Sequence, residues 1–539
     1  MTFTKRIFLF LAILLASHTY AQTISMDQLP MEDALRRLQL LGKIEGDISF
    51  MLRPLQSTRL HSWDSILQSI DPTVKAMGNK KIDKQFLGKW GYASLLPVQI
   101  TQQYITAQPF QELDGPMIAS SGYQVMASAG VFAKLGPLTI QLQPQYVSAS
   151  NNDFRGTKQT PNYQQSSWGN SSIRLNAGPV SIGISSENIT WGPSLMNPLL
   201  MSAHAPGFLH YTLNSRRPLR TPIGSFEWQW VAGYLDDLDI NFTNIADNPH
   251  DYAIKKRYYN GSMFSYQPKW IKGLSIGAIR VVQEPEVLLK DNKEWNLLFR
   301  NVSRATDKEQ FVNSLLGSVE ENRDQYASFF FRWIFQPAQA EFYTEWGRND
   351  AFFNMRDFIQ NPEHSRGYTY GFRKLFKQTK ANEYWQIISE YTRLQQPSTY
   401  PVRSAGTWYV HGGGGYEEYG QIMGAPIGSG GNSMMFRISK FKGWEQKAIQ
   451  VESTTQQADR YEEPYYRLTY LNPSTAKWVD FGFRLLYDRP YKKLFISTTL
   501  AFKRSYNYNF YQPADATGFG FNNPNDLNSF LFKISFRYL

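Results

Sequence analysis

The sequence predicts an all-β fold, a closed antiparallel transmembrane β-barrel of about 18 strands with a small N-terminal helical domain. Aromatic residues make up 15% of its 539 residues and charged residues 19%, and the mean hydropathy is −0.43, which is too polar for helical spans and too aromatic for disorder. Apolar and polar residues alternate with a period of two from about residue 97. A chain that crosses a membrane by strands must close into a barrel, because lipid pairs with no backbone N–H or C=O group.

Residues 1–21 are predicted to be a secretory signal peptide. Lys5 and Arg6 precede an apolar core over residues 7–16, and Thr19-Tyr20-Ala21 provides a cleavage site. No later window of 18 apolar residues predicts a transmembrane helix. The chain contains no Cys, which excludes a lipoprotein anchor, a disulfide and a thiolate metal site.

Residues 22–92 are predicted to form a small helical domain at the periplasmic end of the barrel. Met31 to Leu41 carries apolar residues at helical spacing and is followed by Gly42, a common C-terminal helix signal. Ser62 to Ile70 predicts a second helix, which Asp71-Pro72 ends, and Thr73 to Gly88 a third of weaker pattern.

Residues 93–539 are predicted to form the barrel itself. Leu138, Ile140 and Leu142 alternate with Thr139 and Gln141, so one face of this strand can meet lipid and the other water. The last segment, residues 529–539, alternates in the same way and ends the chain in the kind of aromatic strand that the barrel-assembly machinery is understood to read.

The connections between the predicted strands alternate in length, as they do in outer-membrane barrels. Tight turns are expected near Gly136, Gly178, Gly273 and Pro337, and long polar loops at about 149–170, 284–324, 395–432 and 505–527. If the barrel's first strand starts and its last strand ends in the periplasm, the number of strands must be even. Counting Phe208 to Asn214 as a further strand makes it odd, so one of the strand assignments must be wrong.

The sequence predicts no catalytic residues, no metal site and no cofactor. The six His residues after the signal show no H-E-x-x-H spacing, and Gly412 to Gly415 lacks the Lys-Ser/Thr of a phosphate-binding loop. A soluble β-protein, and a barrel hydrolase whose Ser and His meet only in space, remain open. The net charge of +11 favours anionic partners, but no basic run with interleaved aromatics predicts nucleic-acid binding.

Four charged residues are predicted to form a polar network in the lumen. Glu341 and Glu345 alternate with aromatics on one strand, so if the aromatics face lipid the carboxylates face inward, where Arg332 and Arg373 can pair with them. Such charge ladders keep a barrel rigid and plugged, which favours a structural role for these residues; direct ligand binding is the alternative.

Three stretches resemble the capsule-assembly Wzi family of outer-membrane proteins. They are Leu38 to Gly42 with Arg53-Pro54-Leu55, Asn188 to Pro193 with Leu199 to Ser202 and Ala205-Pro206, and Gly415-Tyr416 with Gly420 to Gly428; the lumen strand Glu341 to Gly347 is also similar. Ala425 stands where the family has a His. The resemblance implies an 18-stranded barrel, a periplasmic helical bundle and a lectin-like role in holding capsular or exopolysaccharide.

On this reading, long extracellular loops bind an acidic polysaccharide at the outer membrane. Aromatic rings of these loops would stack on sugars and arginines would meet carboxylates; the residues expected to do so are Trp191, Tyr409 and Tyr416 for stacking and Arg216, Arg217 and Arg220 for charge. The segment from Trp191 to Arg220 can instead fold inward and occlude the pore. The alternative function is a porin or transporter for small solutes or saccharides.

Overall fold

The computed structural model describes most of the chain between residues 23 and 538. The described ranges are 23–24, 29–44, 48–56, 81–82, 91–154, 162–236, 256–286, 324–349, 355–377, 382–396, 407–411, 414–459, 477–510 and 526–538. The predicted signal peptide and the predicted helix over residues 62–70 lie outside these ranges.

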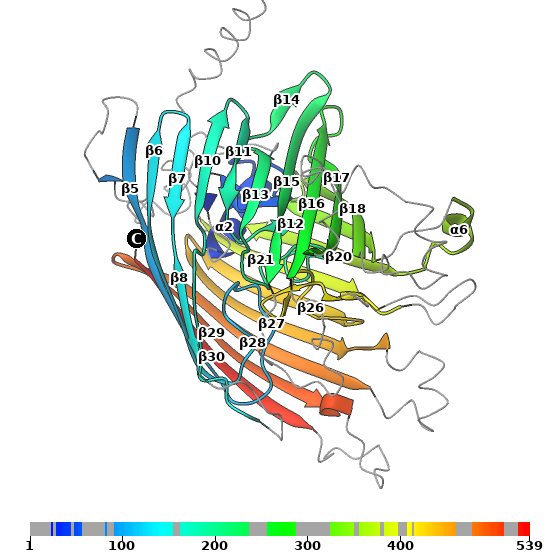
Figure 1. The fold of residues 1–539 in the computed structure, drawn as a ribbon. Coiled ribbons are helices and arrows are strands. Elements are labelled where there is room, and N and C mark those ends of the chain that lie inside the picture. Colours follow the sequence, from blue (N-terminus) through cyan, green and yellow to red (C-terminus); the bar gives the residue numbers. More distant parts are fainter. Residues whose placement is uncertain are drawn as a thin grey trace, which may run out of the picture.

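Long antiparallel strands make up the wall (Figure 1). In its first half these are β5 (Gly91–Ile105), β6 (Gly122–Leu135), β7 (Leu138–Leu142), β8 (Gln145–Ala149), β9 (Tyr163–Ser167), β10 (Ser172–Ala177), β11 (Val180–Ser185), β13 (His210–Ser215), β14 (Leu219–Thr221), β15 (Gly224–Asp236), β16 (Lys256–Pro268) and β17 (Leu274–Pro285). The second half contains β18 (Asp324–Phe335), β19 (Ala340–Arg348), β20 (Arg366–Lys377), β21 (Glu383–Arg393), β26 (Asn432–Lys442), β27 (Glu445–Gln456), β28 (Trp478–Tyr491), β29 (Leu494–Tyr506) and β30 (Leu527–Tyr538).

The described strands form one closed barrel of 18 strand positions. Three of these positions are each occupied by two successive short strands: β7 and β8, which both pair with β6; β9 and β10, which pair with β8 and β7; and β13 and β14, which both pair with β15. The barrel closes where β30 pairs with β5, with Lys533 opposite Gln103. The predicted fold class is therefore confirmed, and the segment 208–214 that made the strand count odd does contain a wall strand, β13.

The two ends of the barrel differ. Tight turns join β6 to β7, β10 to β11 and β28 to β29, and both Gly91 and Tyr538 lie at that same end. We call it the short-turn end, and the opposite end, where the long connections lie, the loop end. This is the arrangement of outer-membrane barrels, whose short turns face the periplasm. Among the described residues no helix is both long and apolar enough to span a bilayer.

The wall strands place apolar side chains outward and polar side chains inward. On β30, Phe530, Phe532 and Tyr538 are exposed, whereas Arg537 is buried in the lumen. Ile140 on β7 likewise lies further out than the buried Gln141. The period of two predicted from the sequence is thus the period of this wall, with one face for lipid and one for the interior.

The helix α2 (Leu29–Leu40) lies inside the barrel near the short-turn end (Figure 1). Its apolar stripe includes Leu35 and Leu38 and packs with Phe50 and with Trp444 and Phe495, two residues of the short-turn end. The helix predicted at residues 31–41 is confirmed, but the described part of residues 22–92 is a plug within the lumen rather than a separate helical domain. The reason is that its polar face has charged partners on the wall.

Several short elements complete the described structure. Residues 81–82, expected in a third helix, instead form the strand β4 (Lys81–Ile82), which pairs with β5. The remaining elements are β1 (Thr23–Ile24), β2 (Leu52–Arg53), β3 (Leu55–Gln56), β12 (Thr190–Trp191), α6 (Met355–Gln360), β22 (Val410–His411), β23 (Gly414–Gly415), β24 (Glu417–Glu418), β25 (Gln421–Ile422) and η7 (Tyr508–Phe510). β12 pairs with β2, which joins the plug to a segment that enters from the loop end.

Candidate functional site in the barrel lumen

A charged network fixes the plug to the wall. Arg332 on β18 donates to Glu341 on β19, with Nε–Oε2 at 2.8 Å, and its Nη1 donates to Gln39 Oε1 of α2 at 2.8 Å. Arg373 on β20 lies 3.3 Å from Glu341 and 2.9 Å from Asp33 of α2. The three wall residues are completely buried. Three of the four predicted lumen residues therefore act together, and they hold α2 as well as one another.

The plug contributes its own charges to this network. Glu32 accepts from Arg36 at 2.9 Å and from Arg53 at 3.2 Å, and Arg53 also donates to the carbonyl of Gly192 at 2.8 Å. Burial raises the pKa of Glu32, but Arg53 and Arg36 outweigh it, so that the pKa lies below its ordinary value. We did not predict these residues as lumen groups, although the i,i+4 pairs Glu32–Arg36 and Asp33–Arg37 are visible in the sequence.

Glu345 faces the lumen, as predicted, but its partners are not arginines. It accepts from Ser328 Oγ at 2.7 Å and from the backbone N–H of Leu199 at 3.4 Å. Leu199 belongs to residues 186–209, which fold into the barrel from the loop end and which we call the inward segment. Glu345 therefore helps to hold this segment against the wall.

Glu390 on β21 is the principal anchor of the inward segment. Its carboxylate accepts the backbone N–H groups of residues 195, 196 and 197 at 2.8, 3.0 and 2.9 Å, and the hydroxyl of Ser194 at 2.8 Å. It also accepts the hydroxyl of Tyr343 at 2.6 Å. The ring of Tyr343 lies over Gly371, where an added Cβ would be 1.9 Å from it. Sequence analysis missed Glu390, because an anchor is recognisable only with its partners in place.

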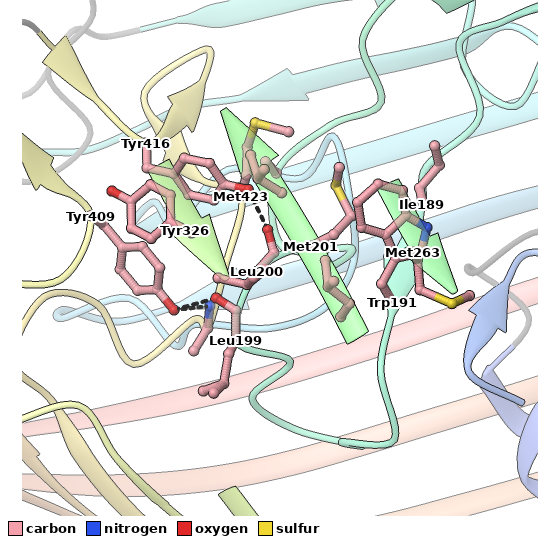
Figure 2. Close-up of a cluster of buried hydrophobic side chains, with 14 of the residues drawn as sticks. Ile189, Trp191, Leu199, Leu200, Met201, Met263, Tyr326, Tyr409, Tyr416 and Met423 are labelled. Atoms are coloured by element: carbon pink, nitrogen blue, oxygen red, sulfur yellow. Dashed lines mark hydrogen bonds between the residues drawn. The ribbon is translucent and has the colours of Figure 1, made fainter. Parts of the chain in front are cut away.

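The inward segment meets an aromatic cluster inside the barrel (Figure 2). Tyr409 donates to the carbonyl of Leu199 at 2.7 Å and Tyr416 donates to that of Leu200, while Trp191 donates from Nε1 to Gln229 at 2.8 Å. Burial raises the pKa of Tyr409 and of Tyr416 above the ordinary value.

Trp191, Tyr409 and Tyr416 were predicted to stack on sugars. Their exposed fractions are 0%, 2% and 0%, so no ring face is available to a glycan and the prediction is wrong for these three in this structure. For Trp191, the alternative that the segment from Trp191 to Arg220 folds inward agrees with its position in the structure. The three rings instead pack the inward segment inside the barrel. A large ring with one polar atom can fill an interior when that atom makes a hydrogen bond, as each of these three does.

The three predicted arginines lie at the short-turn end, not in the loops where we expected them. Arg216 is buried, its backbone N–H donates to the carbonyl of Pro179, and its guanidinium donates to that of Gly178 at 3.1 Å, both in the β10–β11 turn. Arg217 and Arg220 are exposed beside it. β13 runs from the loop end to the short-turn end, and this direction, which the sequence leaves open, decides their position.

Two observations describe the acidic and histidine residues of the lumen. Within the described ranges, no group of three or more His, Asp or Glu residues is arranged to hold a metal ion. His204 of the inward segment lies with Nδ1 2.8 Å from the carbonyl oxygen of Glu112, and burial lowers its pKa.

Comparison with known proteins supports the fold. No protein-family model and no curated protein matches the sequence. Among solved structures, Wzi of Escherichia coli, described as an outer-membrane protein involved in group 1 capsule assembly and a carbohydrate-binding β-barrel, aligns with 96% of this chain and 98% of its own at 12% identity and a TM-score of 0.59. The fold is that of Gram-negative outer-membrane barrels.

Two further barrels align less closely. OccAB2 of Acinetobacter baumannii aligns with 82% of this chain and 97% of its own at 12% identity and a TM-score of 0.41. OprD of Pseudomonas aeruginosa aligns with 86% of this chain and 97% of its own at 10% identity and a TM-score of 0.37.

Proposed function

We propose that the protein is a lectin-like outer-membrane barrel that holds an acidic capsular or exopolysaccharide at the cell surface. The observation that carries the proposal is the filled lumen: the plug enters from the short-turn end, the inward segment enters from the loop end, and buried ion pairs and aromatic rings fix both to the wall. Such an interior supports a rigid platform for loops better than a wide pore.

Two further features fit this role. The net charge of +11 favours an anionic polymer, and the similar barrel of Escherichia coli is described as carbohydrate-binding. The exposed aromatic and aliphatic side chains of the wall would meet outer-membrane lipid, and the aromatic C-terminal strand β30 would be recognised by the barrel-assembly machinery. The porin or transporter alternative requires solute movement through the barrel and is tested by conductance.

Glycan binding by the purified full-length protein tests the proposal. We expect an acidic polysaccharide to bind and a neutral one of similar length to bind less, with affinity for the acidic polymer falling as salt rises, because added salt screens exposed charges. In cells, deleting the gene should shift capsular material from the cell-bound to the shed fraction. Equal binding of neutral and acidic polymers, unaffected by salt, would contradict an acidic ligand.

Arg217 and Arg220 remain our candidates for the acidic groups of the polymer; because the short-turn end of such barrels faces the periplasm, they would meet the polymer during its assembly on that side rather than hold it at the cell surface. We expect R217A/R220A to weaken binding of the acidic polysaccharide about threefold to tenfold, since exposed ion pairs contribute roughly 0.2–1 kcal/mol each, and to reduce its salt dependence. K492A/K493A is the matched control, because it removes two exposed cations from another turn at the same end. Equal losses in both variants would show that only net charge matters.

A further inference from the structure

Two cavities follow one another along the wall formed by β26–β30 and β5. The larger, of about 260 Å³, reaches the short-turn end at Phe495 and Arg537. The smaller, of about 110 Å³, reaches the loop end at Trp478 and Tyr508. Gln111, Met196 and Arg484 line both of them. The two cavities therefore meet at one position, about midway along the strands.

Two carboxylates of the larger cavity's lining, Glu112 and Asp114, lie beside this junction and form what we call the carboxylate closure. Residues 106–121, the connection between β5 and β6, enter the lumen and bring Glu112 and Asp114 against the wall. Glu112 accepts from Arg484 on β28 and, at 2.7 Å, from Lys533 on β30; Asp114 accepts from Lys533 at 2.8 Å. Arg484 is held from its other side by Glu452 at 3.0 Å. Glu112 and Asp114 thus link the connection to two strands, β28 and β30, next to the place where the two cavities meet.

The closure is ionic at neutral pH. Burial raises the pKa of Glu112, but Lys533 and Arg484 outweigh it and lower the pKa to about 2. The ion pairs are at most 18% exposed, so salt screens them much less than surface pairs. Backbone contacts hold the same connection elsewhere: Lys503 Nζ donates to the carbonyl of Pro109 at 2.7 Å. We therefore expect removal of the two carboxylates to free the connection beside the junction while Lys503 still holds it at Pro109.

We propose that the two cavities are one passage for small anionic solutes, and that Glu112 and Asp114 keep it closed. Together the linings carry seven cationic and seven anionic side chains, so the closed passage is balanced in charge. Without Glu112 and Asp114 the cations exceed the anions by two. The strands β26–β30 themselves contribute five cations and three anions: Arg437, Arg484, Lys503, Lys533 and Arg537 against Glu452, Asp480 and Asp488. An open passage thus attracts anions, and this property is independent of polysaccharide retention.

Conductance of the full-length protein in a planar bilayer tests the passage, with chloride as the probe anion. We expect the wild type to pass little current and E112A/D114A to pass at least tenfold more, with a reversal potential in a KCl gradient that shows anion preference. E112Q/D114N, which keeps the side-chain volume, tests loss of charge alone and is used if the alanine variant does not fold. The control is E286A, which removes a half-exposed partner of Lys256 at the loop end.

A substituted cysteine locates the current. Because the chain has no Cys, S433C in the lining of the smaller cavity provides a single thiol for a charged methanethiosulfonate reagent. We expect the reagent to reduce the current of E112A/D114A/S433C at least threefold and to leave E112A/D114A unchanged. Folded closure variants as silent as E286A, cation preference, or a current that modification of residue 433 does not reduce would each overturn the proposal.

Discussion

Glu390→Ala is expected to free the inward segment from the wall and to lower the free energy of unfolding by about 3–5 kcal/mol. The carboxylate accepts five hydrogen bonds from residues 194–197 and Tyr343, and each buried donor left without an acceptor costs roughly 1–3 kcal/mol, less where water enters the space that alanine leaves. Hydrogen exchange of the amides of residues 195–197 should become faster by at least tenfold while that of the wall strands changes little.

The control for this variant is Glu383→Ala on the same strand, whose side chain is only partly buried at the short-turn end. For Glu390→Gln we expect a free energy of unfolding and amide exchange rates between those of the two alanine variants. The amide oxygen of Gln still accepts hydrogen bonds, whereas its NH₂ group cannot accept them. Unchanged amide exchange in Glu390→Ala would show that the aromatic cluster around Tyr409 and Tyr416 holds the inward segment without the carboxylate.

Arg332→Ala is expected to release the plug. This side chain joins the wall to the plug through Glu341, Gln39 and the carbonyl of Ser49, the last at 3.1 Å. Removing one member of a buried ion pair typically costs about 3–5 kcal/mol, because the remaining charge is left in the interior; Arg373, 3.3 Å from Glu341, offsets part of this cost. The midpoint of urea unfolding in detergent should fall accordingly, and protease should cut between residues 29 and 56 sooner.

Arg489→Ala provides the comparison, since Arg489 is an exposed arginine at the same end of the barrel. Arg332→Lys should recover little of the loss, because one ammonium group cannot replace a planar guanidinium that contacts three partners. If Arg332→Ala unfolds at the wild-type urea concentration and its plug resists protease equally, α2 is held by its apolar stripe around Leu35 and Phe50 alone.

The lumen network shows how far the sequence predicts this site. The alternation around Glu341 and Arg332 placed both in the interior, because a strand with lipid on one face must turn its charges to the other. Glu345 follows the same rule, but besides Ser328 on the neighbouring strand its partner is Leu199, which is more than a hundred residues away in the chain. Which carboxylate pairs with an arginine and which with a backbone amide therefore depends on tertiary contacts.

Trp191, Tyr409 and Tyr416 show more clearly what local sequence cannot predict. Aromatic residues in long loops of a basic barrel are compatible with sugar stacking and with packing inside the lumen, and local sequence does not distinguish the two. The path of the loop decides: Tyr409 and Tyr416 bond the carbonyls of the inward segment and lose their free faces. In the same way, the direction of β13 decides at which end of the barrel Arg217 and Arg220 lie.

The sequence by itself determined the closed barrel, the two faces of its strands and the helix of the plug, because the periods of 2 and 3.6 residues record which side of an element meets apolar surroundings. Only the tertiary structure decided that the plug lies within the lumen, that Glu390 anchors the inward segment, and that Glu112 and Asp114 meet Arg484 and Lys533 beside the junction of two cavities. These contacts join residues far apart in the chain, and their geometry follows from closure of the whole barrel rather than from any local pattern.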